Sequence, residues 1–257
     1  MSVPRHLKHA FLLLLSFSCA EPGSASISRG NRAALEGRLD EAVTAYQQAC
    51  AEAPGLARAH ALLGNALWAQ DKPAEAQVAW QDAIQRDPEQ LDAALGLARL
   101  EQLHGTPGLA IDRLGAALKK SPRRADFHAA LALALVQRAA EGDLPLALEE
   151  SDQAARGAPK NPDVLYTRGA VLTAAHRFNE AQATLDTLER LDPRSSLAPY
   201  GLARLAAAQA RKTDVMLHLR AARSAAGAAW TKEPVLADPA FAFLRDDPDF
   251  AREVSEP

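Results

Sequence analysis

The sequence predicts an all-α fold in which helix pairs repeat along most of the chain. Five prolines recur at steps of 34, 34, 37 and 34 residues, at Pro54, Pro88, Pro122, Pro159 and Pro193. A small residue keeps the same rhythm, at Ala42, Ala76, Ala110, Ala147 and Ala181. Hydrophobic residues make up 48% of the 257 residues and aromatic residues only 5%. This composition suits small-on-large helix packing and does not suit a β-rich core.

Residues 57–88 form the best-preserved helix pair. One face of the first helix carries His60, Leu63, Gly64 and Leu67, which follow helical spacing. Pro73 fits the first position of a second helix, because its missing N–H is not needed there. Pro88 ends that helix, since the residue before a proline avoids the α region. One such pair cannot bury its apolar faces alone, so copies are expected on both sides.

The register of this pair predicts six units of about 34 residues. They cover residues 23–56, 57–90, 91–124, 125–161, 162–195 and 196–229. The small residue of each first helix is Gly30, Gly64, Ala98, Ala132, Gly169 or Ala203. The large residue of the second helix is Tyr46, Trp80, Leu114 or Leu185, whereas Ser151 fits this position poorly. The fourth unit has three extra residues, which we expect between its helices at 139–145.

The order of small, large and proline residues in 57–88 resembles the tetratricopeptide repeat, which has a 34-residue period. His60 and Leu67 stand where this family usually has Trp and Tyr. The resemblance covers about residues 24–254. It implies a right-handed superhelical solenoid of about six helix-turn-helix repeats, with the first helices lining a concave groove. In the family this groove commonly takes an extended peptide or a helix.

Residues 230–257 are expected to cap the last, degraded unit. Asp238-Pro239 and Asp247-Pro248 each predict a helix start, with Asp as N-cap and proline in the first turn. The large apolar residues expected to cover the exposed end of the stack are Phe241, Phe243, Leu244 and Phe250.

Residues 1–19 predict an export signal. A basic segment precedes a short apolar stretch at 10–17, which is too short to span a bilayer, since that needs about 20 residues. A buried first helix is the alternative interpretation.

Cys19 follows this stretch in a context that resembles a bacterial lipoprotein signal, in which the cysteine is acylated. Ser16 and Phe17 depart from the usual pattern. Ordinary cleavage near 18–20 or 23–25 would instead release a soluble protein. If Cys19 is acylated, Cys50 is a lone thiol that we expect in the repeat core. If Cys19 is free, a disulfide between the two cysteines is the alternative.

The resemblance also indicates which residues face the groove. The position after each small residue of a first helix points into it, which selects Asn31, Asn65, Arg99, Leu133, Ala170 and Arg204. Neighbouring groove positions are Arg58, Trp68, Gln102, Tyr166 and Tyr200. Asn side chains can bond a peptide backbone, Arg can take a carboxylate, and aromatic anchors often dominate binding energy. A merely solvated polar face is the alternative. The basic set with which some family members clamp a carboxylate is missing.

The sequence favours a binding protein over an enzyme. The histidines lack metal-ligand spacing, and we find no nucleophile motif or phosphate loop, so no catalytic residue, metal or cofactor is expected. The net charge of −3 gives no basic field for nucleic acid. We therefore expect a protein- or peptide-binding scaffold of the bacterial cell envelope, lipid-anchored through Cys19, that supports assembly of a multiprotein complex. The alternatives are a soluble periplasmic or secreted protein that self-associates, and the docking subunit of an enzyme complex.

Overall fold

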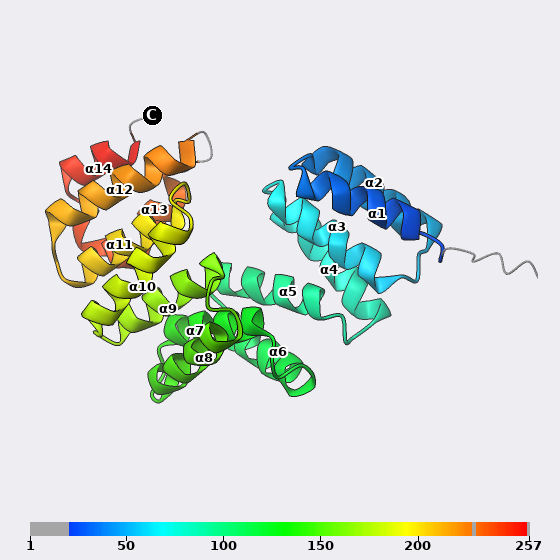
Figure 1. Ribbon diagram of the computed structural model, residues 1–257, viewed down its shortest axis with the longest axis horizontal. Helices are drawn as coiled ribbons and strands as arrows, with labels where there is room; N and C mark the ends of the chain where they lie inside the picture. Colours follow the sequence, from blue (N-terminus) through cyan, green and yellow to red (C-terminus); the bar gives the residue numbers. More distant parts are fainter. Residues whose placement is uncertain (1–20, 228–229, 256–257) are drawn as a thin grey trace, which may run out of the picture.

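The computed structural model describes residues 21–227 and 230–255, which fold into a curved stack of six helix pairs (Figure 1). The first helices are α1 (Ser24–Leu35), α3 (Ala57–Ala69), α5 (Leu91–Leu103), α7 (Ala125–Arg138), α9 (Pro162–Ala174) and α11 (Leu197–Ala208). The second helices are α2 (Leu39–Glu52), α4 (Pro73–Arg86), α6 (Pro107–Lys120), α8 (Asp143–Gly157), α10 (Phe178–Leu191) and α12 (Lys212–Ala226). These described residues contain no strand. The prediction of an all-α solenoid of about six repeats is confirmed.

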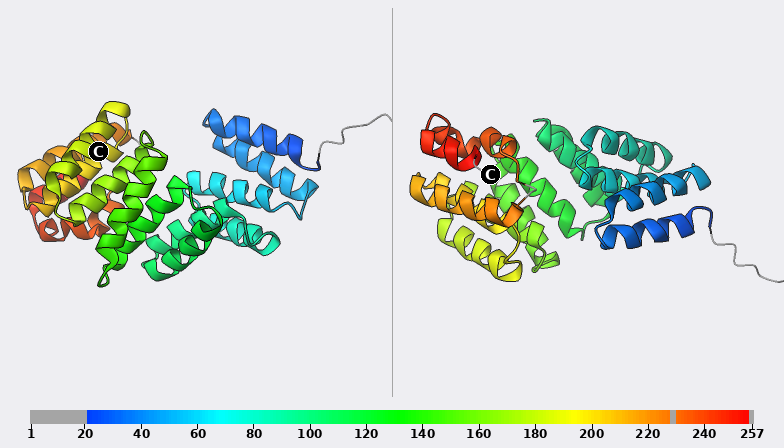
Figure 2. Two further views of the ribbon diagram at one scale, coloured as in Figure 1. Left: turned by 60° about the horizontal axis from the view of Figure 1, so that its bottom comes forward. Right: turned by 90° about the horizontal axis from the view of Figure 1, so that it is seen from above.

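Each pair packs on the next, so the stack is continuous along the chain. Figure 1 shows it curving from α1–α4 through α5–α8 to α9–α14, and two further views show the same order (Figure 2). First helices also contact the first helices of neighbouring pairs, as α3 contacts α5 and α9 contacts α11. The first helices therefore form one inner layer, which is where the groove residues were expected.

The turn inside most pairs has one shared geometry. A single residue lies in the left-handed region, with φ of 72° at Gly37, 58° at Asp71, 71° at Gly105, 57° at His176 and 55° at Ala210. The next residue donates its N–H back into the preceding helix, as Lys72 does to the Leu67 carbonyl at 3.0 Å. This bond satisfies a carbonyl that the helix end leaves open. The turns are therefore set by backbone hydrogen bonds, and residues other than glycine tolerate them.

A glycine-flanked tryptophan shows how neighbouring units pack. Trp80 of α4 is only 2% exposed, and it lies against Gly64 of its own unit and Gly96 of the next. A Cβ at Gly64 would be 2.5 Å from the indole Cδ1, and one at Gly96 would be 2.3 Å from its Cε2. Real Cβ atoms do not approach so closely, so only glycine fits at both positions. Gly64 was predicted as a packing position, whereas the role of Gly96 appears only in the structure.

The same arrangement recurs with smaller side chains. Leu185 of α10 is fully buried, and a Cβ at Gly169 or Gly201 would be 2.7 or 2.6 Å from its Cδ2. In the fourth unit Ser151 is buried, and its hydroxyl donates to the Leu148 carbonyl at 2.9 Å. Ser151 is thus small for this packing position, but its buried hydroxyl has a hydrogen-bond partner on its own helix.

The extra residues of the fourth unit are not confined to its turn. Helix α7 has 14 residues and α8 has 15, against 13 in α3 and 14 in α4, so only part of the insertion lies between the helices. Residues 143–145, expected in the turn, belong to α8. Buried Asp143 accepts hydrogen bonds from Arg138 Nε at 2.9 Å and from the Ala140 N–H at 2.8 Å. These bonds close the longer turn, so the helices can lengthen.

A capping segment, residues 230–255, follows α12. It contains α13 (Glu233–Ala237), the short 3-10 helix η2 (Pro239–Leu244) and α14 (Pro248–Ser255). Asp238 Oδ1 accepts the Ala240 N–H at 2.9 Å and Asp247 Oδ1 accepts the Asp249 N–H at 3.0 Å, so both act as N-caps. Phe241, Leu244 and Phe250 are buried, but Phe243 is 52% exposed. The expectation that Phe243 covers the stack is wrong, because a 3-10 helix directs neighbouring side chains to different faces.

The export signal and Cys19 lie outside the described residues. Cys50 is half-buried against Ile27, Ala49 and Ala59, and burial raises the pKa of its thiol. Within residues 21–227 and 230–255, no helix has both the length and the apolar character that a membrane crossing requires.

The glycine contacts yield a matched pair of substitutions. Gly96→Ala places a methyl group against Trp80 and should lower the free energy of unfolding by about 1–3 kcal/mol. Gly115→Ala, inside α6 with no heavy atom within 4 Å of the added Cβ, should raise it by about 0.5–1 kcal/mol through helix propensity. Urea titration followed by circular dichroism measures both, and equal stabilisation by the two alanines would contradict the packing role of Gly96.

Candidate functional site

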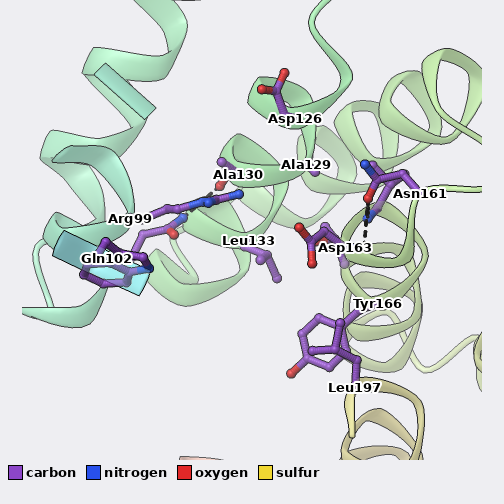
Figure 3. A pocket seen from close by; sticks show the side chains of 13 residues that line it. Arg99, Gln102, Asp126, Ala129, Ala130, Leu133, Asn161, Asp163, Tyr166 and Leu197 are labelled. Atoms are coloured by element: carbon purple, nitrogen blue, oxygen red, sulfur yellow. Dashed lines mark hydrogen bonds between the residues drawn. The ribbon is translucent and has the colours of Figure 1, made fainter. Parts of the chain in front are cut away.

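A cavity of about 340 Å³ opens on the inner layer of the solenoid; we call it the groove cavity (Figure 3). Its walls come from five consecutive first helices, from α3 to α11, and from the residue that precedes α9. The lining residues are Trp68, Arg99, Gln102, Asp126, Ala129, Ala130, Leu133, Asn161, Asp163, Val164, Tyr166, Thr167 and Leu197. The structure thus brings together five of the predicted groove residues, which are Trp68, Arg99, Gln102, Leu133 and Tyr166.

Apolar and aromatic groups line opposite ends of the groove cavity. Trp68 of α3 is half-buried, and its ring centroid lies 5.7 Å from that of Trp80 at an interplanar angle of 43°. At the other end, half-buried Tyr166 of α9 lies beside Leu197 of α11 (Figure 3). Buried aromatic rings carry large apolar areas and tend to dominate interface energies. This cavity therefore offers anchoring surfaces at both ends.

Gln102 fixes the wall between α5 and α7. Its side-chain Nε2 donates to the Ala130 carbonyl at 2.8 Å. Its own backbone carbonyl accepts a hydrogen bond from Gln137 Nε2 at 2.6 Å. Because its amide nitrogen is already bonded within the chain, Gln102 is a structural element of the wall as well as a lining residue.

Charges of opposite sign face each other in the groove cavity. Arg99 is exposed and forms no ion pair or hydrogen bond with any described residue. Asp163 points into the same space from the first turn of α9 (Figure 3). Its backbone N–H donates at 2.9 Å to Asn161 Oδ1, the N-cap of that helix. A cation and an anion are therefore both presented to a ligand.

The second carboxylate of this cavity is already neutralised. Asp126 accepts hydrogen bonds from Arg124 at 2.9 and 2.6 Å. Burial would raise the pKa of Asp126, but the hydrogen bonds and positive charge of Arg124 outweigh burial and lower it. Arg99 and Asp163 are thus the charges left for recognition.

The two predicted asparagines do not line the groove cavity, and each accepts a hydrogen bond from a buried aromatic side chain. Asn65 Oδ1 accepts from Trp80 Nε1 at 3.0 Å, and Asn31 Oδ1 accepts from the Tyr46 hydroxyl at 2.8 Å. A buried Tyr or Trp needs a partner for its polar atom. Where the large residue is Leu114 or Leu185, no such partner is needed, and the corresponding position has no asparagine.

The capping segment contacts the two predicted groove residues of α11, Tyr200 and Arg204. The Tyr200 hydroxyl donates to Asp238 Oδ2 at 2.7 Å, and Arg204 Nη1 donates to the same oxygen at 3.0 Å. Burial and the adjacent Asp238 charge raise the pKa of Tyr200, so its hydroxyl stays protonated as a donor. Burial also raises the pKa of Tyr166, against the opposing charge of Arg204.

Arg58 and Ala170 do not line the groove cavity, and Arg58 is exposed on α3. The repeat position of Arg58 nevertheless identifies three lining residues of the groove cavity that the sequence analysis did not select. Counted in repeat register, Asp126, Asp163 and Leu197 occupy the same position in later units, and all three line the groove cavity. Extending the Arg58 position along the repeat would have found them.

The lining residues can recognise a ligand but show no arrangement for catalysis. They include no histidine or cysteine. Among the residues that the structure describes, no group of three or more His, Cys, Asp or Glu side chains could hold a metal ion.

Comparison with known families places the chain among repeat proteins. Residues 30–71 match a family described as TPR repeat, and residues 61–112 and 138–205 match two families described as tetratricopeptide repeat. No curated protein matches the sequence.

Solved structures share the fold at low sequence identity. A thermophilic TPR protein of Thermus thermophilus is 23% identical, with a TM-score of 0.60 over 67% of this chain and 92% of that one. PilF of Pseudomonas aeruginosa is 18% identical, with a TM-score of 0.58 over 79% and 90% of the two chains. PilW, described as a widely conserved type IV pilus biogenesis factor, is 11% identical, with a TM-score of 0.62 over 79% and 92%.

Substitutions at Asn65 and Arg99 should differ in their effect on the stability of the fold. Asn65→Ala removes the acceptor of Trp80 Nε1 and should lower the free energy of unfolding by about 1–2 kcal/mol. Arg99→Ala, at an exposed position without a partner in the described chain, should change it by less than about 0.5 kcal/mol. Urea titration of both variants measures this difference. Equal stability of wild type and Asn65→Ala would show that the hydrogen bond to Trp80 is not needed.

Proposed function

Since this chain belongs to the tetratricopeptide repeat family, we propose that it is a scaffold whose groove cavity holds an extended segment of a partner protein. The observation that carries the proposal is the convergence of five consecutive first helices on one cavity with an unpaired arginine. Loops and turns contribute little to this surface, so it is held on rigid elements. A surface of this kind can bind without a large rearrangement of the backbone.

The lining residues support a definite partner chemistry. Arg99 suits a carboxylate of the partner, because guanidinium groups bond carboxylates in a two-pronged geometry. Trp68, Leu133 and Tyr166 suit apolar side chains on either side of that carboxylate. Asp163 suits a basic group or backbone N–H groups of the same segment. The ligand is thus an extended segment with one acidic residue between apolar residues.

We propose that the protein acts in the bacterial cell envelope. Residues 1–19 have the basic and apolar segments of an export signal, and Cys19 stands where a lipoprotein would be acylated. First helix α1 begins at Ser24, so an anchor at Cys19 would hold the solenoid close to the membrane. PilW, similar in fold, is described as a pilus biogenesis factor, which supports a role in assembling an envelope complex.

The groove proposal is tested by site-specific photocrosslinking in cells. A photoreactive phenylalanine at Arg99 should give a discrete crosslinked partner, because this side chain opens into the groove cavity. The matched control places the same residue at Lys119, which is exposed on second helix α6. Once the partner is identified, Arg99→Ala should raise its Kd about tenfold, the effect of losing one anchor worth about 1.4 kcal/mol. Equal crosslinking at both positions, or an unchanged Kd, would refute the assignment.

The anchor is tested separately by metabolic labelling with palmitate. Wild type should incorporate label and fractionate with membranes, and Cys19→Ala should do neither. Cys50→Ala is the control, since it removes the other cysteine and should leave labelling unchanged. Equal labelling of wild type and Cys19→Ala would rule out acylation at Cys19.

Self-association remains the competing function, and the capping segment is where it would act. Light scattering of the purified chain distinguishes the two, since the proposed scaffold is expected to be monomeric without its partner. A dimer that disappears when residues 230–257 are removed would favour self-association.

A further inference from the structure

The end of the inner layer is already occupied by a segment of the chain itself. Asp238, only 7% exposed, presents its carboxylate to Tyr200 and Arg204 of α11. Both partners are at groove positions of the last repeat, and Tyr200 is one 34-residue step after Tyr166, which lines the groove cavity. A carboxylate held by arginine and tyrosine donors is the arrangement expected of a bound acidic ligand.

An aromatic ring completes this contact. Phe241 of η2 is fully buried, and its ring meets that of Tyr200 edge-on, with centroids 6.0 Å apart and planes at 81°. The sequence from Asp238 to Phe241 is Asp-Pro-Ala-Phe. Its proline fixes the backbone at the start of the turn, and its aspartate also caps η2. A four-residue motif therefore supplies a charge, a fixed turn and an aromatic anchor.

The chain uses the same motif a second time. Residues 247–250 read Asp-Pro-Asp-Phe, and Asp247 forms an ion pair with Lys212 of α12. Phe250 is fully buried, with its ring centroid 5.9 Å from that of Phe241. In both copies the aspartate contacts a basic residue of the last helix pair while the phenylalanine is buried.

The capping segment depends on these contacts for its structure. Its helices have five, six and eight residues, and helices this short are not stable alone in water. In the ion pair with Asp238, the Arg204 side chain is 36% exposed, whereas the Asp238 side chain is 5% exposed. This segment is thus held on α11 and α12 by the ion pairs of Asp238, Asp247 and Glu253 and by its buried apolar side chains. Among these contacts, the one that a competing carboxylate would replace is the pair of Arg204 with Asp238.

We propose that α11 carries a recognition subsite for an Asp-Pro-x-Phe segment, and that the capping segment occupies it as an internal ligand. A partner bearing this acidic, proline-fixed, aromatic motif binds Tyr200 and Arg204 when residues 230–255 detach. Tyr200 lies one repeat after Tyr166, which lines the groove cavity, so detachment would extend this cavity by one repeat. This inference rests on the proposed function only in that the inner layer is taken as the binding surface.

The test uses a fluorescein-labelled peptide with the sequence of residues 236–245, Leu-Ala-Asp-Pro-Ala-Phe-Ala-Phe-Leu-Arg, and the full chain. Asp238→Asn keeps an N-cap for η2 but removes the charge that Arg204 binds. Fluorescence anisotropy should show this variant binding the peptide at least tenfold more tightly than wild type does. A peptide with asparagine in place of its aspartate should lose binding, as should the double variant Asp238→Asn, Arg204→Ala.

Lys119→Ala in the Asp238→Asn background should leave peptide affinity unchanged, because Lys119 is exposed on second helix α6. Equal affinity of wild type and Asp238→Asn, or equal binding of the asparagine peptide, would overturn the proposal. Hydrogen exchange on the wild-type chain gives a second measurement that needs no substitution. Excess peptide should accelerate exchange in residues 233–255 but not in 197–226, and unchanged exchange at saturating peptide would also overturn it.

Discussion

The solenoid depends on one contact, the insertion of a bulky side chain of a second helix between two first helices. Trp80 fills this space between Gly64 and Gly96, and Leu185 does so between Gly169 and Gly201. Interiors are close-packed, so the size of the inserted group sets how closely the helices approach. The spacing of the first helices then decides which side chains converge on the groove cavity.

Periodic features were predictable, whereas features that join two units were not. The proline and alanine register predicted that helix pairs repeat along the chain, because it reflects a local rule of chain geometry. Gly96 was missed because its partner Trp80 belongs to the preceding unit. Asn31 and Asn65 were assigned to the groove because their position faces it in the family, but each bonds an aromatic polar atom. That contact depends on which large residue each unit has, and no single position reveals it.

The candidate site was predictable in part for the same reason. Trp68, Arg99, Gln102 and Tyr166 converge as their repeat positions indicate. Asp163 and Leu197 follow from the position of Arg58 once it is carried through the 37-residue unit. Tyr200 and Arg204 have groove positions, yet the capping segment covers them. Sequence periodicity cannot show that contact, because residues 230–255 lie outside the repeat.

The packing of Trp80 has a consequence for how such a chain can be cut and rejoined. Its two glycine neighbours lie on opposite sides of the boundary near Pro88, so neither unit alone contains the whole contact. A unit deleted or transplanted at its prolines would leave an indole facing a methyl group, or a glycine facing empty space. The piece that can be exchanged is therefore offset from the sequence repeat: it runs from the small residue of one first helix to the small residue of the next, which keeps Gly64, Trp80 and Gly96 together.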